Sequence, residues 1–160
     1  MSETIRRATA ADAADITDMI HGLAEFEHAA DQCTVTEKQI STALFENSPI
    51  AYAHVAEVDG QIAAMALWFV NFSTWDGVAG IHLEDLFVRN SFRRRGLARR
   101  LLATLAGECV DNGYTRLSWA VLNWNADAIA LYDGIGGQPQ NEWTTYRLSG
   151  SALAELAGPR

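Results

Sequence analysis

A cluster of arginines in an otherwise acidic chain is the first feature that could do chemistry. Five arginines lie between Arg93 and Arg100, although the 160 residues carry a formal net charge of −8. They precede a periodic apolar stretch that predicts a helix over 96–112, and a helix start offers unpaired N–H groups that bind phosphate oxygens. Gly96 and Ala98 are small enough for a bulky anion to approach the backbone. The pattern predicts an anion site, and the alternative, a solvated basic patch, is unfavourable at a helix start.

Three stretches with helical periodicity must position this loop and its surroundings. Two capping boxes, Thr9 to Asp12 and Thr36 to Gln39, indicate where the first two helices begin. Gly113 follows the third helix, as is typical of a C-terminal cap. The apolar positions expected to face the core in the first and third helices are Ile16, Met19, Ile20, Leu23, Phe26, Leu97, Leu101, Leu102, Leu105 and Cys109.

Strand-like segments alternate with these helices. Asp59-Gly60 is a typical hairpin dipeptide that joins two of them, and the second of the pair is apolar on both faces, as a central strand would be. Strands are expected at residues 4–9, 52–58, 61–72, 80–88, 115–122 and 143–148, with a loop at 71–80 and a short helix at 125–135. This order predicts a mixed α/β chain with a crossover helix between two neighbouring strands.

Length and composition limit the class of protein. A chain of 160 residues with 49% apolar and 20% charged residues fits one globular domain over 1–160. It has no apolar run long enough to span a membrane and no signal-peptide stretch near its start, so we expect a cytoplasmic protein with no membrane partner.

Charge and metal-binding side chains exclude further classes. The net negative charge argues against nucleic acid as a partner. It suits a cationic substrate, although an acidic surface also keeps a protein soluble. Cys33 and Cys109 stand far apart and the four histidines do not cluster, so we expect no disulfide and no metal.

Three segments in a fixed order carry a family pattern. They are the strand Leu83–Val88, the Arg-x-x-Gly-x-Ala sequence Arg93–Ala98, and Asn123–Tyr132. Together they resemble the GNAT superfamily of N-acetyltransferases, which implies a mixed, mostly antiparallel central sheet flanked by helices, with splayed fourth and fifth strands, and a homodimer. Further segments resemble its diamine (spermidine/spermine-type) acetyltransferase group: Ile5–Asp12, Leu23–Glu27, Thr36–Lys38 and His82–Asp85.

The resemblance implies acetyl-CoA as the co-substrate. Its pantetheine arm would lie in the slot between the splayed strands, where an N–H at or near Val88 could polarise the thioester carbonyl. The amides of the arginine loop would hold the pyrophosphate, and Asn125 would hydrogen-bond the pantetheine arm. The residues implied in cofactor binding are Leu86, Phe87, Val88, Arg93, Arg94, Arg95, Gly96, Leu97, Ala98, Arg99, Asn125, Ala126, Asp127, Ala128 and Tyr132.

The resemblance implies two catalytic residues. Tyr132 would protonate the leaving thiolate, although the residue pattern alone favours a helix residue at the edge of the core. The acceptor amine must lose a proton, which costs roughly 4 to 5 kcal/mol at pH 7. Glu84, mid-strand where an unpaired carboxylate is costly to bury, is the candidate base or the anchor of the ammonium group. Strand alternation predicts that Asp85 points to the opposite face.

The acceptor implied is a small cation that carries a primary amine, either a diamine or polyamine or a thialysine-like or lysine-like molecule, attacked directly in a ternary complex. The residues implied to contact it are Phe26, Glu27, Glu84, Ser118, Trp119 and Ala120. The loop at 71–80, expected to shape the acceptor pocket, departs from the diamine group and leaves the amine open. A catalytically silent acyl-CoA-binding module and an acetyltransferase of protein or peptide amines are the alternative functions.

Overall fold

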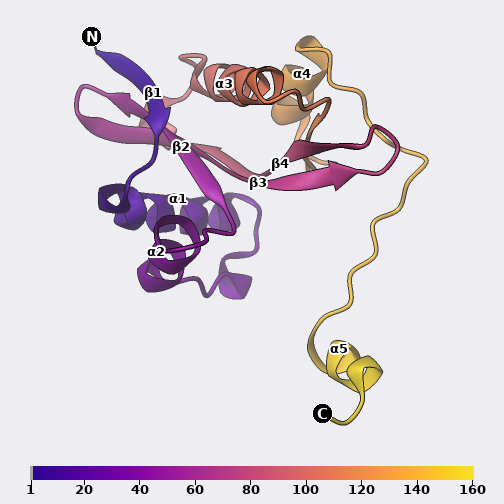
Figure 1. The fold of residues 1–160 in the computed structure, drawn as a ribbon. Coiled ribbons are helices and arrows are strands. Elements are labelled where there is room, and N and C mark those ends of the chain that lie inside the picture. Colours follow the sequence, from indigo (N-terminus) through magenta and orange to yellow (C-terminus); the bar gives the residue numbers. More distant parts are fainter. Residues whose placement is uncertain (1) are drawn as a thin grey trace. The chain divides into compact units, whose positions relative to one another are not determined.

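The computed structural model describes residues 2–160, which form two compact units, one up to Trp124 and one from Asn125 to Arg160. The strands of the first unit are β1 (Glu3–Arg7), β2 (Tyr52–Val58), β3 (Gln61–Ser73), β4 (Val78–Val88) and β5 (Leu117–Ser118). They form one sheet in the order β1-β2-β3-β4-β5 (Figure 1). Only β4 and β5 pair in parallel, and the other neighbours are antiparallel. The predicted mixed, mostly antiparallel sheet is confirmed.

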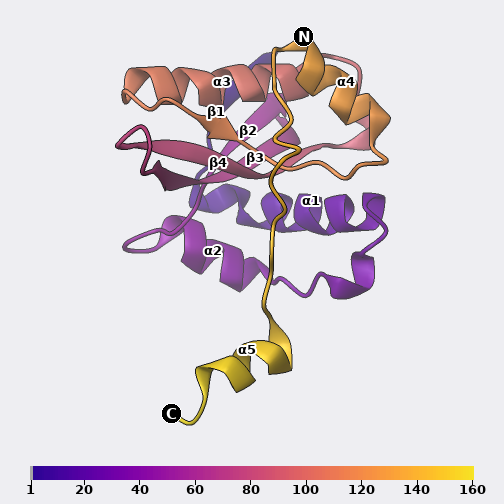
Figure 2. The ribbon, with the colours of Figure 1, turned by 90° about the vertical axis from the view of Figure 1, so that its right-hand side faces the viewer.

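Helices cover both faces of this sheet. α1 (Ala13–Phe26) and α2 (Glu37–Phe45) lie on one face and α3 (Leu97–Asp111) lies on the other (Figure 2). Both predicted capping boxes are present. Short 3-10 turns are η1 (Ala10–Asp12), η2 (Ala30–Gln32) and η3 (Asn90–Phe92).

The helical periodicity identifies most of the core correctly, although Phe26 at the end of α1 is exposed and Ile20 and Leu23 are only partly buried. Ile16 and Met19 of α1 are fully buried and pack with Ile40, Leu44, Ala53, Val55, Met65 and Leu67. On the α3 face, the buried residues are Leu97, Leu101, Leu102, Leu105 and Cys109, as predicted. Cys109 is therefore a small core residue, which agrees with the usual burial of a free cysteine.

A β-bulge interrupts β4 in its middle. Leu83 pairs with Trp68 and Asp85 pairs with Leu67, which leaves Glu84 as an extra residue between two consecutive pairs. Leu67 belongs to the core cluster beneath α1 and α2, so its partner Asp85 lies on that face. Such a bulge increases the local twist and changes the direction of the side chains beside it.

β4 and β5 form a fork. They pair only at Ile81 with Leu117 and at His82 with Ser118, whereas β4 continues to Val88. The splayed fourth and fifth strands are thereby confirmed. The strand predicted at 115–122 shrinks to two residues because the strands diverge beyond Ser118 and lose their hydrogen-bonding distance.

The loop predicted at 71–80 is much shorter than expected, because β3 runs to Ser73 and β4 begins at Val78. Asp76 in the remaining turn accepts hydrogen bonds from Thr115 Oγ1 at 2.7 Å and from Arg116 Nε at 3.0 Å. The turn holds the segment that leads into β5. Since a strand rises about 3.4 Å per residue, this turn lies far along β4 from Glu84 and does not line the open end of the fork.

The second unit contains α4 (Ala126–Gly134) and α5 (Gly150–Ala157). α4 confirms the short helix predicted at 125–135. The strand predicted at 143–148 is wrong, because these residues have no strand partner in the structure. Residue types mark a segment that suits a sheet, and only backbone pairing makes it a strand.

Candidate active site

The arginine loop has a left-handed backbone immediately before α3. Gly96, the N-cap residue of α3, has a φ of 77°, and Arg94 has a φ of 64°. Glycine adopts this conformation freely, whereas arginine does so at a cost. The Arg100 N–H donates to the Gly96 carbonyl at 3.0 Å, so the N–H groups of Leu97 to Arg99 have no acceptor within the helix. These donors and the positive end of the helix dipole form an anion site.

The side chains of this loop point in different directions. Arg93 Nε donates to the Val88 carbonyl at 3.0 Å, and the Arg93 guanidinium lies 5.2 Å from the ring centroid of Phe26 and 5.6 Å from that of Phe87. Arg100 Nη1 donates to Glu3 at 2.8 Å. Arg93 therefore connects the predicted cofactor loop to Phe26, a predicted acceptor contact at the end of α1.

β4 has an open backbone edge beside this loop. Its pairing with β5 stops at His82, whereas its pairing with β3 continues to Val88. Within the described part of the chain, residues 83–88 therefore have no strand neighbour on the β5 side. A ligand that carries amide groups can add to such an edge as a strand would.

One face of β4 packs tightly against α1. A Cβ atom on Gly22 would lie only 3.1 Å from the Phe87 ring. Glycine at this position lets the helix approach the strand closely, so Phe87 is held under α1. The partly buried side chain of Phe87 thus packs against the core cluster, whereas its backbone lies on the open edge of β4.

Three carboxylates gather on the α1 face near the fork. Glu27 caps the end of α1, and Glu84 and Asp85 lie at the bulge of β4. Burial, together with the charges of Glu84 and Glu27, raises the pKa of Asp85 to about 6. Burial also raises the pKa of Glu27. Partly desolvated like charges are unfavourable on their own, so this group of side chains favours a cation.

The prediction that Glu84 and Asp85 point to opposite faces is wrong. Leu83 pairs with Trp68, whose indole donates to His54 beneath α3. Glu84, the next residue, therefore points toward the α1 face, and the bulge gives Asp85 the same direction. Strand alternation is the only signal that the sequence offers, and the extra residue becomes visible only against the partner strand.

His82 occupies the vertex of the fork. Its Nδ1 lies 3.2 Å from Ser118 Oγ, and its Nε2 lies 3.7 Å from Glu84 Oε2. The ring packs against Phe69, with centroids 5.1 Å apart. The imidazole therefore links the bulge of β4 to Ser118, one of the predicted acceptor contacts.

An aromatic group lies at the end of α1. The ring centroid of Trp124 lies 5.8 Å from that of Phe26 and 5.4 Å from that of His28. Trp124 was not predicted as a site residue, and its place inside the Asn123–Tyr132 segment was the available signal. The predicted contacts Trp119 and Ala120 directly follow β5, where Trp119 is partly buried and Ala120 is exposed.

The predicted acid and its neighbours belong to the second unit. Asn125 is the N-cap residue of α4, and its Oδ1 accepts a hydrogen bond from the Ala128 N–H at 3.3 Å. Asn125 therefore holds the first turn of α4. Tyr132 is a partly buried residue of α4, while Ala126 and Asp127 are exposed.

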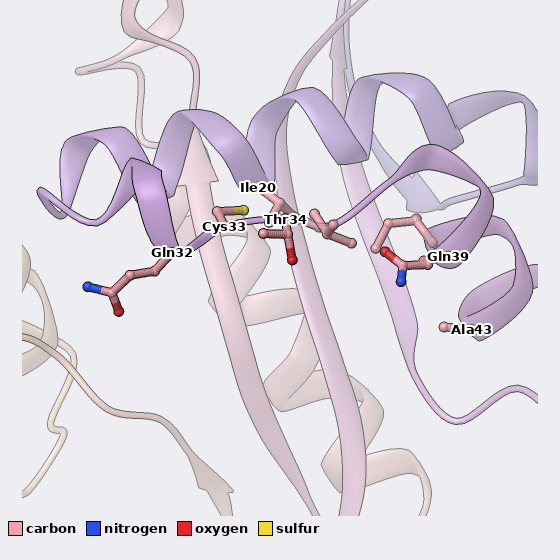
Figure 3. Close-up of a pocket in the computed structure, with 8 residues that line it drawn as sticks. Ile20, Gln32, Cys33, Thr34, Gln39 and Ala43 are labelled. Atoms are coloured by element: carbon pink, nitrogen blue, oxygen red, sulfur yellow. The ribbon is translucent and has the colours of Figure 1, made fainter. Parts of the chain in front are cut away.

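A shallow hollow of about 500 Å³ lies elsewhere, beside α1 and the segment that leads into α2 (Figure 3). Its lining includes Ile20, Cys33 and Gln39 and none of the predicted site residues. Among residues 2–160, no group of three or more His, Cys, Asp or Glu side chains could hold a metal ion. None of the helices in these residues combines the length and the apolar character that crossing a membrane requires.

The fork, the left-handed loop before α3 and the open edge of β4 together define a GNAT-type acetyltransferase. The model of the acetyltransferase (GNAT) family matches residues 19–136, so the chain belongs to this family. It is 39% identical to the thialysine N-epsilon-acetyltransferase of Caenorhabditis elegans, over 91% of each chain. It is 33% identical to that of Bos taurus, over 96% of each chain. The L-ornithine N5-acetyltransferase NATA1 of Arabidopsis thaliana is 28% identical, over 98% of this chain and 88% of its own length.

Solved structures show the same fold. An integron cassette protein from V. cholerae superposes with a TM-score of 0.83 at 23% identity, over 99% of each chain. An aminoglycoside N-acetyltransferase in complex with CoA superposes with a TM-score of 0.71 at 19% identity, over 92% of this chain and 95% of its own. The family and the enzyme class predicted from the sequence are confirmed.

Proposed function

We propose that the chain transfers an acetyl group from acetyl-CoA to a primary amine of a small cationic acceptor, by direct attack in a ternary complex. The observation that carries this proposal is the group of three carboxylates, Glu27, Glu84 and Asp85, on the α1 face near the open edge of β4. An ammonium group relieves their mutual repulsion, and the open edge accepts the thioester that the amine must reach.

The cofactor would use backbone groups more than side chains. The first-turn amides of α3 would hold the pyrophosphate, because their N–H groups point out of the helix start. The pantetheine arm would lie along residues 86–88, with an N–H near Val88 directed at the thioester oxygen. In the second unit, Asn125 would bind the pantetheine arm and Tyr132 would protonate the leaving thiolate.

The amine end would be held by the carboxylates. Glu84 is the base or the anchor of the reacting ammonium group, and its 56% exposed side chain leaves it accessible to a ligand. Glu27 and Asp85 would hold a second positive charge. This arrangement suits a lysine-like, ornithine-like or diamine acceptor, in agreement with the thialysine and ornithine acetyltransferases among the relatives. The proposal includes the homodimer that the family resemblance implies.

The test measures thiol release from acetyl-CoA with a panel of amines: thialysine, lysine, ornithine, putrescine, spermidine and the monoamine butylamine. We expect turnover with acceptors that carry a second cationic group and little with butylamine. Glu27→Gln should raise KM for the amine more than it lowers kcat, while KM for acetyl-CoA stays unchanged. Turnover that does not distinguish diamines from butylamine would contradict the role of the carboxylates, and no turnover with any amine would contradict the proposed reaction.

A further inference from the structure

His82 is placed to take part in the proton transfer that precedes acetylation. It stands at the last pair of β4 and β5, where the fork opens, and its two ring nitrogens face different groups. Nε2 faces the Glu84 carboxylate at 3.7 Å and Nδ1 faces the Ser118 hydroxyl at 3.2 Å. The ring is 29% exposed and Glu84 is 56% exposed, so the carboxylate reaches further into solvent than the imidazole behind it.

We propose that His82 accepts the proton of the acceptor amine through Glu84 and releases it through Ser118. The inference rests on the proposed function, because it names the route by which the ammonium group of the acceptor becomes a nucleophile. His82 acts through Glu84 and is therefore a positioning and proton-accepting residue, not one that contacts the substrate.

The ammonium N–H bond breaks, the electron pair stays on nitrogen, and an O–H bond forms on Glu84. That proton then moves to Nε2 of His82. The lone pair freed on the amine nitrogen of the acceptor attacks the thioester carbonyl. The imidazolium gives its Nδ1 proton to Ser118 Oγ as the hydroxyl proton passes to water. A hydroxyl both donates and accepts, so Ser118 supports the ring before and after the transfer.

The chemistry of the side chains favours imidazole as the final acceptor. A free amine of this kind holds its proton with a pKa near 10.4, a carboxylate with one near 4.3, and an imidazole with one near 6.5. Transfer beyond a carboxylate to an imidazole is therefore less uphill than a transfer that ends on the carboxylate. The distance of 3.7 Å exceeds a hydrogen bond, and a small rotation of the exposed Glu84 side chain shortens it.

If His82 accepts the proton, kcat falls when His82 is already protonated at acidic pH. Other charged groups on this face would also make kcat depend on pH. They are Glu84 and Asp85 on β4, Glu27 at the end of α1, and Arg93 after β4. Asp85 is the main competitor, because burial and the charges of Glu84 and Glu27 raise its pKa to about 6. The experiment must therefore separate His82 from Asp85.

The experiment is the pH profile of kcat at saturating acetyl-CoA and amine for the wild type, His82→Gln, Asp85→Asn and Ser118→Ala. We expect His82→Gln to lower kcat about tenfold or more, within the usual range of acid–base catalysis. The fall of kcat toward acidic pH, the inflection of the wild-type profile, should be lost in His82→Gln and retained in Asp85→Asn. Ser118→Ala should show a smaller loss. In a separate assay with the His82→Ala variant, added imidazole should raise kcat in proportion to the imidazole concentration. A purely structural role of His82 would not allow this rescue.

Two results would overturn the inference. One is His82→Gln with wild-type kcat and an unchanged profile, and the other is an inflection that disappears in Asp85→Asn and persists in His82→Gln. A folded His82→Ala variant that imidazole does not rescue counts against it as well. Wild-type turnover with amines in the same assay keeps the proposed function standing in each case, so the two failures are distinguishable.

Discussion

Replacing Asp85 by asparagine should make the protein more stable and less active. Burial and the charges of Glu84 and Glu27 raise the pKa of Asp85 from 3.8 to about 6. Since one pKa unit corresponds to about 1.4 kcal/mol, the ionised carboxylate costs the fold about 3 kcal/mol. This is an upper value, because the partly exposed side chain is screened by solvent.

The sign of the pH dependence follows from proton binding. Between pH 3.8 and about 6 the native state binds more protons at Asp85 than the unfolded state does, so stability falls as pH rises through this window. Asp85→Asn removes that penalty. The gain should be full above pH 6 and shrink toward pH 4, and its upper limit in melting temperature is roughly 10 °C for a chain of this size.

Chemical denaturation at pH 8 and pH 5 measures the difference between variant and wild type. Asp31→Asn, an exposed aspartate in η2, is the matched control and should change stability by less than about 0.5 kcal/mol. Steady-state kinetics should show a raised KM for the amine. A variant that is no more stable than wild type at pH 8, or whose gain is the same at pH 5, would refute the reasoning.

Three further changes test other parts of the site. Gly96→Val should weaken acetyl-CoA binding about tenfold or more by calorimetry. The φ of Gly96 is 77° and no atom lies within 4 Å of a Cβ added there, so backbone strain is the cause. Gly96→Asn, which tolerates this conformation, should lose less affinity, and unchanged affinity in both variants would refute the loop assignment. Tyr132→Phe should lower kcat and keep acetyl-CoA affinity, and full activity would reassign the acid. Burial and the charge of Arg7 lower the pKa of His54, and the charge of Glu108 opposes them. The stability of the wild type relative to His54→Gln should therefore fall as pH drops below about 6.5. Denaturation curves with the same pH dependence in both proteins would contradict this.

Local periodicity was sufficient to predict most elements of the fold. The buried faces of α1 and α3 repeat every three or four residues, and both capping boxes lie where their side chains indicated. The β5 strand and the segment at 143–148 were overestimated for one reason. A strand depends on a partner, and the residue types of one segment do not reveal whether that partner runs alongside or diverges.

The same limit explains the errors at the site. The direction of Asp85 depends on a register shift opposite Leu67 and Trp68, which no pattern within β4 announces. The links of His82 to Ser118 and of Phe26 to Trp124 join residues far apart in the chain. The backbone part of the cofactor site was predictable, because a glycine before an apolar helix has a local signature, whereas the acceptor side depends on tertiary contacts.

Because β5 has only two residues, it should separate from the sheet locally more often than β4 does. β4 is paired with β3 at every residue except the bulge at Glu84, whereas β5 is held by two pairs and by the turn at Asp76. Amide hydrogens of β5 should therefore exchange with solvent through small, frequent fluctuations, and those of the central part of β4 only when most of the sheet unfolds. One wall of the fork is then stiff and the other compliant, so acceptors of different width would be accommodated mainly by movement of the β5 side.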